Sequence, residues 1–147
     1  MKNLPKHLSY TKAWERINAA IEAEFNLEAI TIEESIISDR LLSYVRGVDP
    51  SSKVHERSGL GELITRWRKH AGDSLIKPDG SDLGKITDEW RIKRNTAVHG
   101  LVKSLPGTPT TQPNDFFELA RQTAEEGKIL AREIQNWHRK TLRAAKV

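Results

Sequence analysis

Apolar residues recur every three or four positions along most of the chain, and no strand-length alternation of polar and apolar residues competes with this spacing. The spacing is typical of amphipathic α-helices. It predicts a first helix over residues 10–25 and a second over residues 27–46. The side chains expected to face the core are Trp14, Ile17, Ile21 and Phe25 in the first helix, and Ile30, Ile37, Leu41, Tyr44 and Val45 in the second.

The ends of the second helix have two interpretations. Residues 31–34, Thr-Ile-Glu-Glu, have the form of a capping box, so the helix could begin there instead of at residue 27. Gly47, followed by Asp49 and Pro50, is expected to end it. A third helix is predicted over residues 60–70, closed by Gly72, with core-facing Leu63, Ile64 and Trp67.

Two longer helices complete the prediction. Ser81 or Asp82 is expected to cap a fourth helix that reaches His99 or a few residues beyond it. After an irregular connection over residues 104–114, residues 115–118, Asp-Phe-Phe-Glu, have the form of a capping box for a fifth helix that ends near residue 142. We therefore expect an all-α antiparallel bundle of about five helices, in a single domain over residues 1–147.

Composition excludes several kinds of protein. The chain has no cysteine, and therefore no disulfide or thiolate zinc site. The remaining candidate metal ligands, His7, His55, His70 and His138, show no ligand spacing with carboxylates, so we expect no metal or other cofactor. Residues 1–8 lack the apolar core of a signal peptide, and no apolar run approaches the ~18 residues of a membrane span. We expect a soluble, cytoplasmic protein without a membrane partner.

The net charge of +4 is unevenly placed along the chain. Residues 1–60 carry eight Lys and Arg against nine Asp and Glu, whereas residues 61–147 carry sixteen against eleven. RNA phosphates could dock on this second part of the chain, and we expect Arg91, Lys93 and Lys103 to bind them. The alternative is an ordinary solvent-facing surface rich in lysine.

The fourth predicted helix carries the residues best suited to chemistry, Arg94, Asn95 and His99. On a helix Asn95 and His99 share a face, and Arg94 lies roughly 140° round the axis from His99. Arginine binds phosphate through two parallel hydrogen bonds, and histidine transfers protons near neutral pH. The combination indicates phosphodiester chemistry on RNA. The structural alternative is that His99 caps the helix and Arg94 pairs with a carboxylate at the edge of the core.

The hexapeptide Arg94-Asn95-Thr96-Ala97-Val98-His99 resembles the Arg-x4-6-His motif of the HEPN superfamily, in the form where Asn follows Arg. The resemblance implies a dimeric helical bundle and a metal-independent endoribonuclease of the toxin or phage-defence type. It assigns catalytic roles to Arg94, Asn95 and His99, with RNA and a cognate antitoxin as partners. One subgroup has a modified Tyr two residues after the His. Leu101 occupies that position here, so control by that modification is not expected.

A second, semi-apolar face of the fourth helix favours a homodimer. This face contains Ile92, Asn95, His99 and Val102, whereas Ile86, Trp90, Ala97 and Leu101 are expected to face the core. A dimer would place two copies of Asn95 and His99 across a shared groove. The alternative is that this face packs against residues 103–114.

Two classes of function stay open. The first is the RNA-cleaving enzyme, and the second is a non-catalytic HEPN-like module that binds RNA or a protein. The complete set of Arg94, Asn95 and His99 favours the enzyme. Two further groups could contribute, namely Glu33, Glu34 and Asp39 as supports for Arg94, and residues 66–70 as an RNA-stacking patch, although Trp67 fits the core better.

Overall fold

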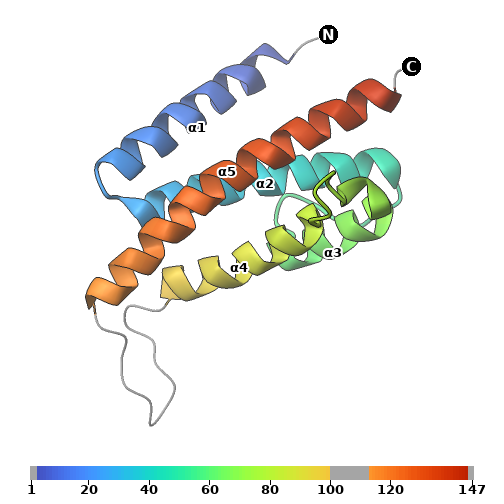
Figure 1. Ribbon diagram of the computed structural model, residues 1–147. Helices are drawn as coiled ribbons and strands as arrows, with labels where there is room; N and C mark the ends of the chain where they lie inside the picture. Colours follow the sequence, from blue (N-terminus) through green and yellow to red (C-terminus); the bar gives the residue numbers. More distant parts are fainter. Residues whose placement is uncertain (1–2, 100–112, 146–147) are drawn as a thin grey trace.

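The computed structural model describes residues 3–99 and 113–145, and in these ranges the chain is an all-α bundle, as the sequence predicts. Helix α5 lies along α2, with α1 on one side of this pair and α3 and α4 on the other (Figure 1). Within the described ranges, no helix is long and apolar enough to cross a membrane. The elements in chain order are α1 (Leu4–Glu22), α2 (Asn26–Val48), α3 (Leu60–Ala71), the 3-10 helix η1 (Gly72–Leu75), α4 (Leu83–His99) and α5 (Pro113–Ala145).

The core is formed mainly by the apolar residues that the helical spacing predicts. Trp67 in α3 is completely buried and contacts Trp137 of α5 edge to face, with ring centroids 5.5 Å apart. Phe25 is the exception, because its side chain is 63% exposed. Helix α1 ends at Glu22, so Phe25 lies in the turn before α2, where Glu24 has a φ of 64°.

Side-chain caps explain where two helices begin, and a glycine explains where a third one ends. Helix α1 begins at Leu4, earlier than predicted, because Asn3 Oδ1 accepts a hydrogen bond from Lys6 N at 3.1 Å and Pro5 suits a first turn. Asp82 caps α4, as predicted, by accepting hydrogen bonds from the backbone N–H groups of residues 84 and 85 at 2.8 and 3.2 Å. Gly72 follows α3 with a φ of 52°, which confirms the predicted end of that helix.

Both predicted capping boxes are wrong. Helix α2 begins at Asn26, so residues 31–34 lie inside it, because the preceding turn buries Ala29 and Ile30 and extends the helix. Helix α5 begins at Pro113, which places Asp115 within the first turn, and Glu118 pairs with Arg121 instead of capping the helix. The other end of α2 also differs, since Gly47 is helical and the helix continues to Val48.

A close approach of three helices joins α2, α4 and α5. Trp90 of α4 donates a hydrogen bond from Nε1 to the Thr123 carbonyl of α5 at 3.0 Å. Gly127 of α5 leaves the space that Glu33 of α2 and Trp90 occupy, since a Cβ there would lie 2.7 Å from Trp90 Cζ2. The Glu33 side chain is fully buried, and neither carboxyl oxygen has a hydrogen-bond partner among the described residues.

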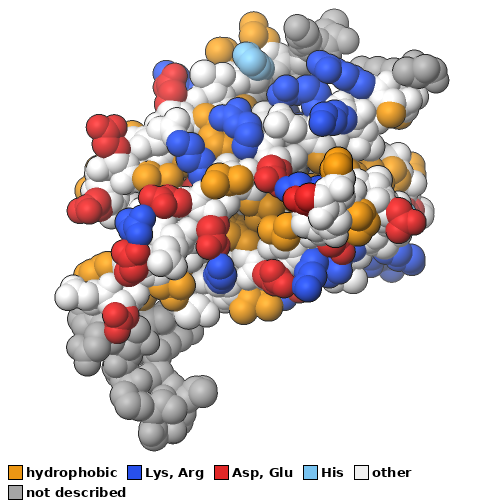
Figure 2. All heavy atoms as spheres, viewed as in Figure 1, with side chains coloured by type: hydrophobic (Ala, Val, Ile, Leu, Met, Phe, Trp, Pro, Cys, Tyr) orange, Lys and Arg blue, Asp and Glu red, His pale blue; other side chains and the backbone are white. Residues whose placement is uncertain are grey.

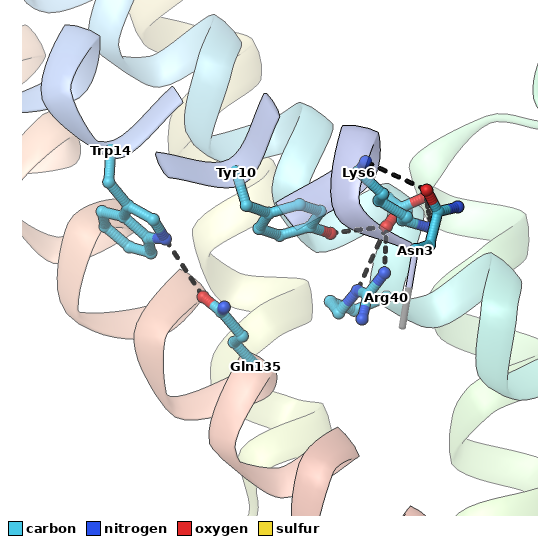
Figure 3. Close-up of polar contacts among 7 residues, drawn as sticks. Asn3, Lys6, Tyr10, Trp14, Arg40 and Gln135 are labelled. Atoms are coloured by element: carbon cyan, nitrogen blue, oxygen red, sulfur yellow. Dashed lines mark hydrogen bonds and ion pairs between the residues drawn. The ribbon is translucent and has the colours of Figure 1, made fainter. Parts of the chain in front are cut away.

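A polar junction holds α1 against α2 (Figure 3). Asp39 of α2 accepts hydrogen bonds from Tyr10 Oη at 2.5 Å, from Lys6 Nζ at 3.0 Å and from the neighbouring Arg40. Burial opposes ionisation of this carboxyl group, but the three hydrogen-bond donors outweigh it and lower the pKa of Asp39. In the same view, Trp14 Nε1 donates to Gln135 Oε1 at 3.1 Å, which joins α1 to α5.

Candidate functional site

Arg94 is held on α4 by an ion pair with α2. Its Nη2 donates to Glu34 Oε1 at 2.7 Å, and the guanidinium-bearing side chain is only 18% exposed. The Nε atom is buried and has no hydrogen-bond partner among the described residues. Of the three acidic residues that could support Arg94, the structure therefore selects Glu34. Glu33 instead faces the core, and Asp39 is occupied at the junction with α1.

Arg94 and His99 occupy different sides of the helix. His99 is the last residue of α4 and is exposed, whereas Asn95 is half-buried. Five helical residues separate Arg94 from His99, which corresponds to about 140° round the axis. Leu101, Val102 and Lys103 lie outside the described residues. Within one chain, the imidazole of His99 thus does not line the groove that Arg94 lines.

The groove beside Arg94 has a volume of about 490 Å³ and lies between α2 and the start of α3. Residues far apart in the sequence meet there, because the connection after α2 folds back beside the helix. The polar side chains that line it are Glu34, Ser35, Ser38 and Asp39 of α2, His55, Glu56 and Ser58 of the connection, and Arg94 of α4.

His55 is a member of this groove that sequence reasoning did not select. Its backbone N–H donates to Ser58 Oγ at 3.0 Å, and its ring Nδ1 accepts a hydrogen bond from the Arg57 backbone N–H at 3.1 Å. The ring is exposed, so a ligand can reach it. A His followed three residues later by Ser in a polar loop is a weak turn signal, and no local pattern connects this turn to Arg94.

Two of the predicted RNA-binding cations are already paired. Arg91 Nε contacts Asp88 Oδ1 at 2.9 Å, and Lys93 Nζ contacts Glu126 Oε2 at 2.9 Å. Surface ion pairs of this kind contribute only about 0–1 kcal/mol, so phosphate could displace either carboxylate. The third candidate, Lys103, falls outside the described ranges.

The basic side chains of α5 do not surround the motif. Residues 130–145 carry four Lys and Arg against one Glu, whereas residues 113–129 carry two against four Asp and Glu. Figure 2 shows Lys and Arg gathered over the C-terminal half of α5. Because α4 ends beside the N-terminal half of α5, this basic surface lies away from His99 (Figure 1).

The structure also bears on two other candidate sites, the RNA-stacking patch over residues 66–70 and a metal site. Trp67 is fully buried and cannot stack on an RNA base, so a stacking patch over residues 66–70 is wrong. In the part of the chain that the structure describes, no three His, Asp or Glu side chains group closely enough to hold a metal ion.

Comparisons with protein-family models, with curated proteins and with solved structures find no match for this chain. The interpretation of the site therefore depends on its residues and their geometry.

Proposed function

We propose that the chain is a metal-independent endoribonuclease of the HEPN type that acts as a homodimer, as a toxin or in phage defence. The observation that carries the proposal is the held guanidinium of Arg94, five residues before an exposed His99 at the end of the same helix. The ion pair with Glu34 orients the guanidinium before any phosphate arrives.

The reaction needs a base, an acid and positive charge at phosphorus. A base removes the proton of the RNA 2′-hydroxyl, and O2′ attacks phosphorus. The bond from phosphorus to O5′ breaks, and an acid protonates O5′. The products are a 2′,3′-cyclic phosphate and a 5′-hydroxyl. In this proposal His99 is one of the two proton-transfer groups, Arg94 stabilises the phosphoryl oxygens, and Asn95 orients the phosphate or His99.

The homodimer is part of this proposal because Arg94 and His99 of one chain face different sides of α4. A second chain packed against α4 brings the partner's His99 toward a shared cleft and supplies the second proton-transfer group. DNA lacks the 2′-hydroxyl and is not a substrate for this reaction.

Replacement of His99 tests the proposal. If His99 transfers protons, His99→Ala lowers the cleavage rate by about 10²–10⁴-fold with an unchanged melting temperature. If His99 only caps α4, the loss is instead about 0.3–1 kcal/mol of stability with cleavage spared. The measurement is cleavage of labelled RNA, with and without EDTA, beside thermal melting. His7→Ala, at an exposed position of α1, is the matched control.

Arg94 is tested in the same assay. Arg94→Ala is expected to lose a similar factor, and Arg94→Lys to recover little of it, because a point charge cannot replace a guanidinium that contacts both Glu34 and phosphate. Full activity in both His99→Ala and Arg94→Ala would contradict the enzymatic proposal.

The alternative is a non-catalytic HEPN-like module that binds RNA or a protein partner such as an antitoxin. The ion pair of Arg94 with Glu34 favours it, since a paired guanidinium stabilises the bundle without any substrate. RNA binding without cleavage, at nanomolar to micromolar protein and in the presence of added divalent ions, would support this module over the enzyme.

A further inference from the structure

We propose that the groove between α2 and α3 binds a phosphate group of the RNA, and that His55 donates a hydrogen bond from Nε2 to the phosphate that Arg94 holds. The inference deepens the proposed function and rests on it for the substrate. Both residues line the one groove of about 490 Å³, although 39 positions separate them in the sequence.

The turn over residues 55–58 fixes which tautomer the neutral His55 ring adopts. Because Nδ1 accepts a hydrogen bond from the Arg57 backbone N–H, the ring proton of the neutral imidazole is on Nε2. Two hydrogen bonds hold the turn itself, one from the His55 backbone N–H to the Ser58 side-chain Oγ and one from the Ser58 backbone N–H to the His55 carbonyl at 2.9 Å. The imidazole is therefore a positioned hydrogen-bond donor before any ligand arrives.

Ser58 adds a second donor to the same groove. Its Oγ accepts the hydrogen bond from His55 N, so its own hydroxyl proton remains available to a phosphate oxygen. Together with Arg94, this arrangement presents three kinds of N–H or O–H donor to one ligand. Phosphate is the matching ligand because its oxygens accept several hydrogen bonds from different directions.

The charges around the groove also allow an anion. Its three carboxylates, Glu34, Asp39 and Glu56, each have a cationic partner. The partners are Arg94 for Glu34, Lys6 and Arg40 for Asp39, and Arg46 for Glu56. Of these cations Arg94 lines the groove, and the other three offset the charges of Asp39 and Glu56 from outside it.

The role of His55 differs from the role proposed for His99. A donor to a phosphoryl oxygen stabilises the negative charge that builds up at phosphorus, and it transfers no proton. Loss of this donor should lower the rate without changing the pH dependence of cleavage. Loss of His99 should remove one limb of the pH profile, because a proton-transfer group is then missing.

Two His55 variants separate the ring nitrogens. His55→Asn keeps an acceptor for the Arg57 N–H but removes the Nε2 donor, and we expect about a 10²–10³-fold loss of cleavage with the parental pH profile. His55→Gln restores an N–H donor near the Nε2 position and should recover part of the rate. His7→Asn is the matched control, and thermal melting of each variant checks the fold. Parental cleavage by His55→Asn, with His99→Ala inactive, would overturn the inference while the proposed function stands.

Phosphate binding is measured separately from catalysis. Inorganic phosphate added to the protein should shift the NMR signal of the His55 Cε1–H, and sodium chloride of equal ionic strength should not. Arg94→Ala should abolish the shift. A phosphate-dependent shift without any RNA cleavage by the parent protein would support the phosphate site and contradict the proposed function. An equal shift in Arg94→Ala, or no shift at all, would overturn the inference.

Discussion

Glu33 and Glu34 are neighbours in α2 with opposite surroundings. One helical residue turns the side-chain direction by about 100°, so Glu34 reaches Arg94 while Glu33 enters the core. Burial raises the pKa of Glu33 to about 9, and the positive charge of Lys128 lowers it only in part. Glu33 is therefore a neutral carboxylic acid at pH 7, whereas Glu34 serves as the partner of a cation.

The buried acid makes stability depend on pH. Between pH 4.5 and 9 the folded chain holds a proton on Glu33 that the unfolded chain has released. The free energy of unfolding should therefore fall as the pH rises, by up to about 1.4 kcal/mol per pH unit. His138 acts in the opposite sense, because burial and then the charge of Arg40 lower its pKa from 6.5 to about 4. Its contribution grows between pH 4 and 6.5.

The two groups nearly cancel below pH 6.5, so the decline should show between pH 6.5 and 9. Urea unfolding of the parent and of Glu33→Gln over this range measures it. Glu33→Gln should be nearly independent of pH there and more stable than the parent at pH 8 and above. A parent protein with constant stability from pH 6.5 to 9 would contradict a protonated Glu33.

At the scale of the elements, helical spacing predicted the helices and most of the core, because burial of one face decides where a helix forms. Helix ends failed where the interpretation relied on capping boxes, since packing of the neighbouring turn outweighs a cap of about 1 kcal/mol. The spacing also contained a missed signal. Glu33 lies three residues after Ile30 and four before Ile37, which places it on the core face of α2.

The candidate site was predictable only in part, because helical spacing reveals which residues share one helix but not which loops pack against it. Arg94 and His99 lie in one helix, so their spacing is visible in the sequence. The choice of Glu34 as partner follows once the core face of α2 is known. The groove with His55 depends instead on how the connection over residues 49–59 folds against α2, and periodicity carries no information on such a contact.

Two glycines give opposite predictions for the same substitution. Alanine in place of glycine favours an isolated helix by about 1 kcal/mol. Gly127→Ala should nevertheless destabilise the bundle, by about 1–3 kcal/mol, because the added Cβ meets Trp90 at 2.7 Å and also meets Glu33. Gly47→Ala, a helical position with nothing within 4 Å of the added Cβ, should be neutral or stabilising.

Thermal melting of both variants checks this pair of predictions. Gly127→Ala should melt below the parent and Gly47→Ala at or above it. Equal melting temperatures for the two variants would mean that α5 can move away from α2 and α4 without cost.

For the whole molecule, the exposed part of α4 leads to the prediction of a homodimer. Ile92, on the semi-apolar face that we expect to form the interface, is 54% exposed. Sedimentation at micromolar concentration should give about twice the chain mass of 16.7 kDa. Ile92→Glu should shift the protein to the monomer, because it places a charge in the apolar interface.

Leu8→Glu, at a position of α1 that is 55% exposed and lies across the bundle from α4, is the matched control and should leave the dimer intact. A parent protein that sediments as a monomer would exclude the dimer and, with it, a cleft built from two chains.

The approach of α2, α4 and α5 around Glu33 has a consequence for the energetics of folding itself. When these helices close at neutral pH, the chain takes one proton from solution, so the proton acts as a ligand of the folded state. Mass action then couples assembly of the bundle to proton concentration. Heat measured on unfolding includes the heat of transferring that proton to the buffer, and the apparent enthalpy therefore differs between phosphate and Tris even where the structure does not.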